Sequence, residues 1–242
     1  MKKLISLTKR NLLEIVRDPL SAVFCIFFPV VMLVFMQVLI SGFDYTPPNF
    51  EIQNYATGIC VFGFTFTAMF ISMSIAGDKN NSFIKRINIS PTKYYVYLLS
   101  FVLSGFVIVI IQSIIFYLIA LIFKLPFDVN LLLSFIYIIP SALFYLSLGV
   151  LLGLLCKNEK QSGPVSSIII SITGMLGGVF MPVTTFTGGI ATVINALPFT
   201  HTVLIASELY TIGASCFFNH ILYILGYTAL IWLIIVLLTK RK

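Results

Sequence analysis

The chain has 242 residues, of which 59% are hydrophobic and 10% are charged, and its mean hydropathy is +1.07. These values lie far outside the usage of soluble globular domains and indicate an integral membrane protein. A net charge of +7 would favour nucleic acid as a partner of a soluble protein. Here the basic residues are dispersed between hydrophobic runs, so we expect no nucleic-acid-binding surface.

The first 18 residues are amphipathic and too highly charged to cross a membrane. At roughly 100° per residue, their apolar and basic side chains fall in two opposing sectors. We expect an interfacial helix over 1–18 on the inner leaflet, with its basic face toward lipid headgroups or a partner. The alternative is a positive flank that only sets topology. Asp18-Pro19 would end the helix, and the residues of interest on it are Lys9, Arg10, Arg17 and Asp18.

Six hydrophobic runs are long enough to cross the hydrocarbon core as helices. They cover about 20–40, 55–76, 95–122, 131–155, 163–180 and 217–239. The connecting segments are short, so the sequence predicts an all-α membrane protein with one transmembrane domain over 1–242. Pro29 and Pro140 lie inside runs and predict kinks.

The basic residues alternate across the predicted spans. Of the 15 Lys and Arg residues, only Lys124 falls on the opposite side from the rest. The positive-inside rule makes the crowded side the cytoplasm, so both termini are predicted to be cytoplasmic.

Two further patterns lie within the spans. Glycines repeat as Gly149-x-x-x-Gly153 and Gly174-x-x-x-Gly178, which allows close approach of helices. Aromatic residues repeat every four positions in the second span, and such a stripe offers an adaptable apolar surface to a substrate. The alternative is plain packing or lipid contact. The pathway candidates are Phe62, Phe66, Phe70, Met73, Phe180 and Met181.

The inner loop 77–93 mixes apolar and basic side chains, whereas a loop that only sets topology needs charge alone. It predicts a short helix over Phe83–Asn88, closed by Ser90-Pro91. Exposure of Phe83, Ile84 and Ile87 beside the basic residues predicts a docking surface.

The stretch 181–216 carries no Lys or Arg and is broken by Pro and Gly. Its two apolar pieces, 190–197 and 203–209, are too short to span, and they predict a re-entrant hairpin entered from outside. An ordinary extracellular loop with a surface helix is the alternative. His201 and Glu208 are seven residues apart and would share one helix face, as a candidate proton site or as interfacial polar residues.

Several chemistries are missing from the sequence. It contains no Walker lysine, nucleophile elbow or metal-ligand cluster, so we expect no enzymatic activity. The centres of the six predicted spans lack ionisable residues, which argues against a secondary transporter. A membrane enzyme would have only His201 with Glu208 as its polar pair. Energy for any transport would therefore come from outside this chain.

Three motifs occur in the order of a known family. The amphipathic start ends in Arg17-Asp18-Pro19, the inner loop carries Ile84-Lys85-Arg86-Ile87, and the broken stretch carries Leu197-Pro198-Phe199-Thr200-His201. On these motifs the whole chain resembles the permease subunits of type-2 ATP-binding-cassette (ABC-2) exporters, in their small six-span branch. It departs from the family in having Asp78 and Ser82 where Glu and Gly are frequent.

The resemblance implies which residues act. A coupling helix over about 82–91 would dock on the ATPase through Phe83, Ile84, Lys85, Arg86, Ile87, Asn88, Ser90 and Pro91. A re-entrant pair over about 181–216 would turn at residues that include Leu197, Pro198, Phe199, His201 and Glu208.

The resemblance also implies partners and cargo. Two permease chains, identical or paralogous, would form a pathway in a bacterial cytoplasmic membrane, and cytosolic ATPase subunits would bind ATP and Mg. This chain itself would hold no cofactor. The uncharged spans favour a hydrophobic or amphipathic cargo, such as a drug, bacteriocin or peptide toxin. Polysaccharide, lipid-linked or ion cargo is the alternative.

Overall fold

The computed structural model describes residues 2–42, 51–81, 83–89, 93–180, 183–210, 212–213 and 215–240. Within these ranges the side chains of Asn80, Lys85, Arg86, Asn88 and Thr184 are not described. The described residues form helices and turns without a β-strand, which confirms the all-α prediction.

Among the described residues, five helical segments are long and apolar enough to cross a membrane, and the bent pair Gly188–Ala196 and Pro198–Ser207 would be a sixth if it is counted as one span. The five are the first segment α2–η1–α3 (Pro19–Ala22, Val23–Phe27, Phe28–Ser41), α4 (Ile52–Asn80), α6 (Tyr94–Ile122), α7 (Val129–Leu155) and α11 (Cys216–Lys240). The remaining helices are α1 (Lys2–Arg17), α5 (Phe83–Ile89), α8 (Glu159–Leu176), η3 (Val183–Thr185), α9 (Gly188–Ala196) and α10 (Pro198–Ser207).

The predicted span 163–180 corresponds to α8, which has shifted bounds and is not among the segments that are long and apolar enough to cross a membrane. α8 begins at Glu159, where the Asn158 side chain caps it by accepting a hydrogen bond from the Gln161 amide at 2.9 Å. It ends at Leu176, so residues 177–180 lie beyond it. Its charged and hydroxyl-rich sequence leaves it less apolar than the five segments above.

Prolines shape the first and fourth spans differently. Residues Val23–Phe27 form a π-helix directly before Pro29, which lies in the first turn of α3. Because proline has no N–H to donate, a widened turn ahead of it is a low-cost arrangement. Pro140 lies inside α7, which continues through it as one helix.

α4 is the centre of the bundle and packs against α3, α6, α7, α8 and α10. Its closest approach is to α7, where a Cβ added to Gly149 would lie 2.5 Å from the Ala68 carbonyl oxygen. One added to Gly153 would lie 2.7 Å from Cβ of Ile75. The first glycine motif therefore allows close helix packing as predicted.

The second glycine motif works differently. Gly174 makes room for the Phe180 ring, and Gly178 lies past the end of α8 with φ of +88°. A left-handed backbone favours glycine, so Gly178 serves a turn and not a helix contact.

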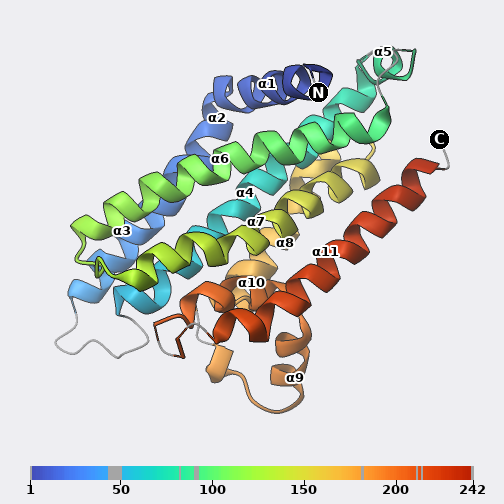
Figure 1. The fold of residues 1–242 in the computed structure, drawn as a ribbon. Coiled ribbons are helices and arrows are strands. Elements are labelled where there is room, and N and C mark those ends of the chain that lie inside the picture. The colour runs from blue at the N-terminus through green and yellow to red at the C-terminus, as the bar shows by residue number, and fades with distance from the viewer. Residues whose placement is uncertain are drawn as a thin grey trace.

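The two ends of the bundle are formed by different helices. α1, α5 and the last turns of α11 lie at one end, and α9 with the start of α11 lies at the other (Figure 1). The predicted interfacial helix and the predicted coupling helix are therefore neighbours.

Candidate functional site

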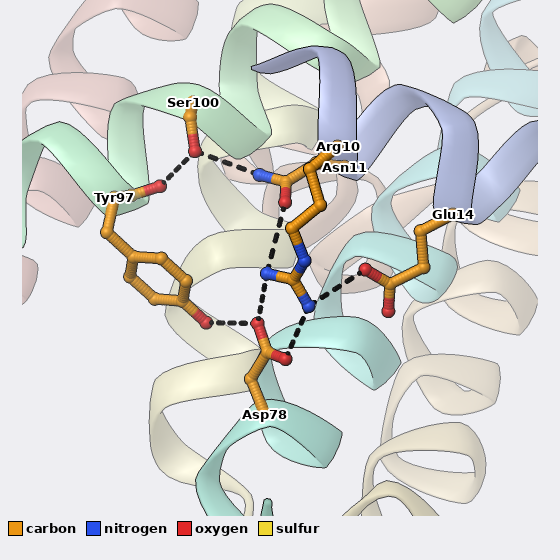
Figure 2. Close-up of polar contacts among 6 residues, drawn as sticks. All are labelled: Arg10, Asn11, Glu14, Asp78, Tyr97 and Ser100. Atoms are coloured by element: carbon orange, nitrogen blue, oxygen red, sulfur yellow. Dashed lines mark hydrogen bonds and ion pairs between the residues drawn. The ribbon is translucent and has the colours of Figure 1, made fainter. Parts of the chain in front are cut away.

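A buried carboxylate joins three helices at the end where α1 and α5 lie. Asp78, in the last turn of α4, is 3% exposed. The guanidinium of Arg10 in α1 donates to both of its oxygens, at 2.7 and 3.0 Å. The Tyr97 hydroxyl of α6 donates to Oδ2 at 2.9 Å. Figure 2 shows the three side chains converging from their separate helices.

The Asp78 carboxylate needs a charged partner because it is buried. A buried carboxylate is costly unless it is paired and hydrogen-bonded, and a bidentate guanidinium meets that need best. Burial disfavours the charge on Arg10, but the hydrogen bond and negative charge of Asp78 outweigh it and raise the pKa of Arg10. Glu14 lies 3.1 Å from the same guanidinium. Burial raises the pKa of Glu14, although the charge of Arg10 opposes this.

A second polar contact ties α1 to α6. Asn11 is fully buried, and its amide donates to the Ser100 hydroxyl at 2.8 Å. Ser100 in turn donates to the Tyr97 carbonyl at 2.6 Å. Ile15, one helical turn beyond Asn11, is 3% exposed. α1 thus packs on α6 along a face that the amphipathic pattern alone does not single out.

The structure changes the expected orientation of the interfacial helix. Arg10, predicted on a basic face toward lipid or a partner, instead turns inward to Asp78. Lys9 and Arg17 are exposed, as are the apolar residues Ile5 (66%) and Val16 (48%). The apolar sector is therefore divided between the protein and the surroundings.

Asp18 marks the end of α1 as predicted, and it also starts the next helix. Its carboxylate accepts hydrogen bonds from the hydroxyl and the backbone amide of Ser21, the latter at 3.0 Å. These bonds lower the pKa of Asp18 and cap α2.

The predicted coupling helix is confirmed as a helix, α5, and its first residue belongs to the ion-pair network. The Arg10 guanidinium carbon lies 3.7 Å above the centre of the Phe83 ring, which is a cation–π contact. The Phe83 and Tyr97 rings are 6.2 Å apart. α1, α4, α5 and α6 therefore meet around one guanidinium.

The exposure of the apolar residues on α5 differs from the prediction. Phe83 packs inward and Ile87 is only 6% exposed, so neither presents its side chain outward. Ile89, which the sequence did not single out, is 86% exposed. Periodicity cannot orient so short a helix. Ser90 and Pro91, like the side chains of Lys85, Arg86 and Asn88, lie outside the description.

Lys79, next to Asp78, connects the end of α4 to α7. Its ammonium donates to the carbonyls of Leu154 and Cys156, at the carboxyl end of α7. A cation there satisfies carbonyls that have no partner within the helix and complements the helix dipole. Two adjacent residues therefore fix the end of α4 to α1, α6 and α7.

The aromatic stripe of α4 is buried within the chain. Phe62 and Phe66 are 4% and 7% exposed. Phe66 contacts Phe24 and Phe28 of the first segment, at ring distances of 5.8 and 4.7 Å, and Phe62 contacts Phe180 at 5.3 Å. This arrangement favours packing over direct substrate contact. Phe70 is also buried, Met73 is half-buried, and Met181 lies outside the described residues.

The broken stretch forms two short helices, α9 and α10, bent by 81° at Leu197-Pro198. α10 is embedded against α4, α7, α8 and α11, with Phe199 beside Phe144 and Tyr145. The two short helices are as predicted, while entry from outside remains a prediction.

His201 and Glu208 do share a side of α10, but a third residue joins them. His220 of α11 lies between, 2.8 Å from His201 and 3.0 Å from Glu208. The sequence shows both histidines, yet no local pattern brings residues 201 and 220 together, because that contact is tertiary.

A family model described as "ABC-2 type transporter" matches residues 2–211. The chain belongs to the ABC-2 type transporter family. A search for curated relatives gave no match. As a member of the family, the chain is a multi-pass membrane permease of an ABC transporter, and it works with an ABC ATPase.

Removal of Arg10 should leave Asp78 buried and unpaired. We expect Arg10→Ala and Asp78→Ala each to lower the melting temperature of the purified permease. A double-mutant cycle should give a coupling of about 1–3 kcal/mol, because the two side chains interact directly. Arg17→Ala is the matched control, since it removes the same charge from an exposed position of α1. Additive effects of the two substitutions would contradict the pairing.

Proposed function

We propose that this permease exports a hydrophobic or amphipathic cargo, such as a peptide toxin, bacteriocin or drug. It does so with its termini and α5 in the cytoplasm of a bacterial cell. ATP and Mg²⁺ are bound by the partner ATPase, and this chain supplies the membrane pathway. The observation that carries the proposal is the network around Asp78 and Arg10. It joins the predicted docking helix to the cytoplasmic ends of α1, α4 and α6.

The network explains how movement of an ATPase reaches the membrane. A force on α5 acts on Phe83, which lies against the guanidinium of Arg10. Arg10 is fixed to α4 through Asp78, and α4 is the central helix of the bundle. Displacement of α5 is therefore passed to α4 and α1 together, without a flexible step between them.

Docking itself depends on the outer surface of α5. Ile89 is its exposed apolar residue among those described, and the sequence of α5 includes two basic residues, Lys85 and Arg86. A short helix with one apolar anchor and two cations suits a cleft that is apolar inside and acidic at its rim.

The surface of α8 favours a pathway between two permease chains. The exposed positions of α8 include Gln161, Ser167 and Ser171, whereas the exposed faces of α6 and α11 are apolar. The two serines donate to carbonyls four residues earlier in their own helix, at 3.0 Å. A hydroxyl-bearing face is better placed against a second chain or a watery pathway than against lipid.

The exposed part of α1 fits the membrane surface. Ile5 and Val16 would enter the interface, while Lys2, Lys3 and Lys9 would meet anionic headgroups. α1 thus links the lipid surface with the Asp78 network.

Charge reversal at Lys85 and Arg86 tests the docking role. We expect Lys85→Glu with Arg86→Glu to abolish co-purification of the ATPase, because the new carboxylates repel an acidic rim. The permease should keep its melting temperature. Lys124→Glu, a single reversal at the opposite end of α6, should leave co-purification intact. Unchanged co-purification of the double variant would refute docking through α5.

The cargo class is tested by ATPase stimulation in the reconstituted complex. Amphipathic peptides and apolar drugs should raise the rate of ATP hydrolysis, because their contacts suit uncharged spans. Oligosaccharides and lipid-linked sugars serve as the comparison. Stimulation by sugars alone would replace the hydrophobic-cargo proposal with the polysaccharide alternative.

A further inference from the structure

Three titratable side chains form a hydrogen-bonded chain between α10 and α11. Nδ1 of His201 lies 2.8 Å from Nδ1 of His220, and Nε2 of His220 lies 3.0 Å from Oε2 of Glu208. Both histidines are almost fully buried, at 7% and 8% exposed. The His201 ring also stacks on Tyr223, with centroids 4.0 Å apart and planes 12° apart. The two imidazoles are thus held at a fixed separation.

The carboxylate of Glu208, at one end of these hydrogen bonds, determines which ring nitrogens of the two histidines carry protons. The Glu208 carboxylate can only accept, so Nε2 of His220 carries a proton. If His220 is neutral, its Nδ1 accepts a hydrogen bond from the N–H at Nδ1 of His201. One added proton can reside on either imidazole ring. Each hydrogen bond among the three side chains then still has one donor and one acceptor.

Addition of a second proton breaks this pattern. Both imidazoles then carry N–H groups at Nδ1 as well as positive charges, and the two donors face each other across 2.8 Å. Neither can accept, and the like charges repel, so the contact has to open. The separation of the rings would move α10 away from the start of α11.

We propose that His201, His220 and Glu208 form an acid-sensitive latch that holds α10 against α11 until both histidines are protonated. Only histidine changes charge near neutral pH without a perturbed environment. The latch therefore opens in the acidic range.

The other groups around the latch do not change charge in that range. On α11 they are Tyr223 and Cys216, and on α7 they are Tyr137 and Tyr145, all of which are neutral in mild acid. Among the described residues, α4 and α8 meet α10 through uncharged groups, such as Gly58 beside Val203 and the Leu176 carbonyl beside Thr200. α9 contains no ionisable side chain.

The latch lies at the end of the bundle opposite to α5 (Figure 1). Given the proposed orientation, it would respond to the pH outside the cell. Which side of the membrane sets this pH rests on the proposed function, whereas the latch itself does not. The opening of the latch itself needs neither cargo nor ATPase, so it can be tested on the permease by itself.

Hydrogen exchange of the full-length permease in nanodiscs tests the latch. The chain has only two histidines, so exchange at their ring carbons, read by mass spectrometry, follows each one separately. We expect two separate titration steps, because the rings interact directly. Backbone amides of α10, corrected for intrinsic rates, should exchange on the order of tenfold faster after the second step. Amides of α6 should show no such step.

His201→Asn is the informative variant, because an asparagine amide lies near the position of Nδ1 but does not protonate. It should abolish the acid step in α10. Tyr223→Phe, which keeps a ring for stacking, should preserve it. If either variant fails to fold, the wild-type profile still decides. Histidines that titrate together, or α10 exchange without an acid step, would overturn the latch. Neither result would bear on docking of α5.

Discussion

The carboxylate of Asp78 is the constraint on which one end of this permease, the end that holds α1 and α5, depends. A charge buried to this degree cannot remain without partners, and the partners come from two other helices: Arg10 of α1 and Tyr97 of α6. The end of α4 therefore cannot move without carrying α1 and α6, or else breaking the pair. An apolar contact at this place would permit sliding, because it is not directional.

The same guanidinium gives the network its second role. Its face covers Phe83, so the first residue of α5 is attached to a charge that is already fixed. Lys79 adds the end of α7 through backbone carbonyls. α5, which we propose docks on the ATPase, is therefore attached to a set of fixed contacts, and such contacts transmit displacement where a flexible loop would absorb it. At the other end, the pair of imidazoles connects α10 to α11.

Much of the fold could be predicted because a bilayer leaves few options. Hydropathy located the long helices, Asp18 marked the break after α1, and Pro198 marked the bend between α9 and α10. The Arg10–Asp78 pair could not be predicted, since its members are 68 positions apart and the amphipathic pattern placed Arg10 on the outer face. The side of α5 that faces outward also escaped prediction, because a helix of 7 residues has too few turns to define a face. The bounds of α8 were missed because its polar first turn, capped by Asn158, is not part of the hydrophobic run, and because the helix ends before the turn at Gly178.

Electron–electron distance measurements on the complex with its ATPase test the central claim most directly. Spin labels at Lys9→Cys in α1 and Ile89→Cys in α5 occupy exposed sites, whereas the four native cysteines are buried. The rigid network predicts that the distance between these labels is the same in the nucleotide-free and ATP-bound states. The distance from either label to one at Val193→Cys, an exposed site on α9 at the opposite end of the bundle, should change. A change between Lys9 and Ile89 on ATP binding would show that α1 and α5 move independently, and would contradict the account.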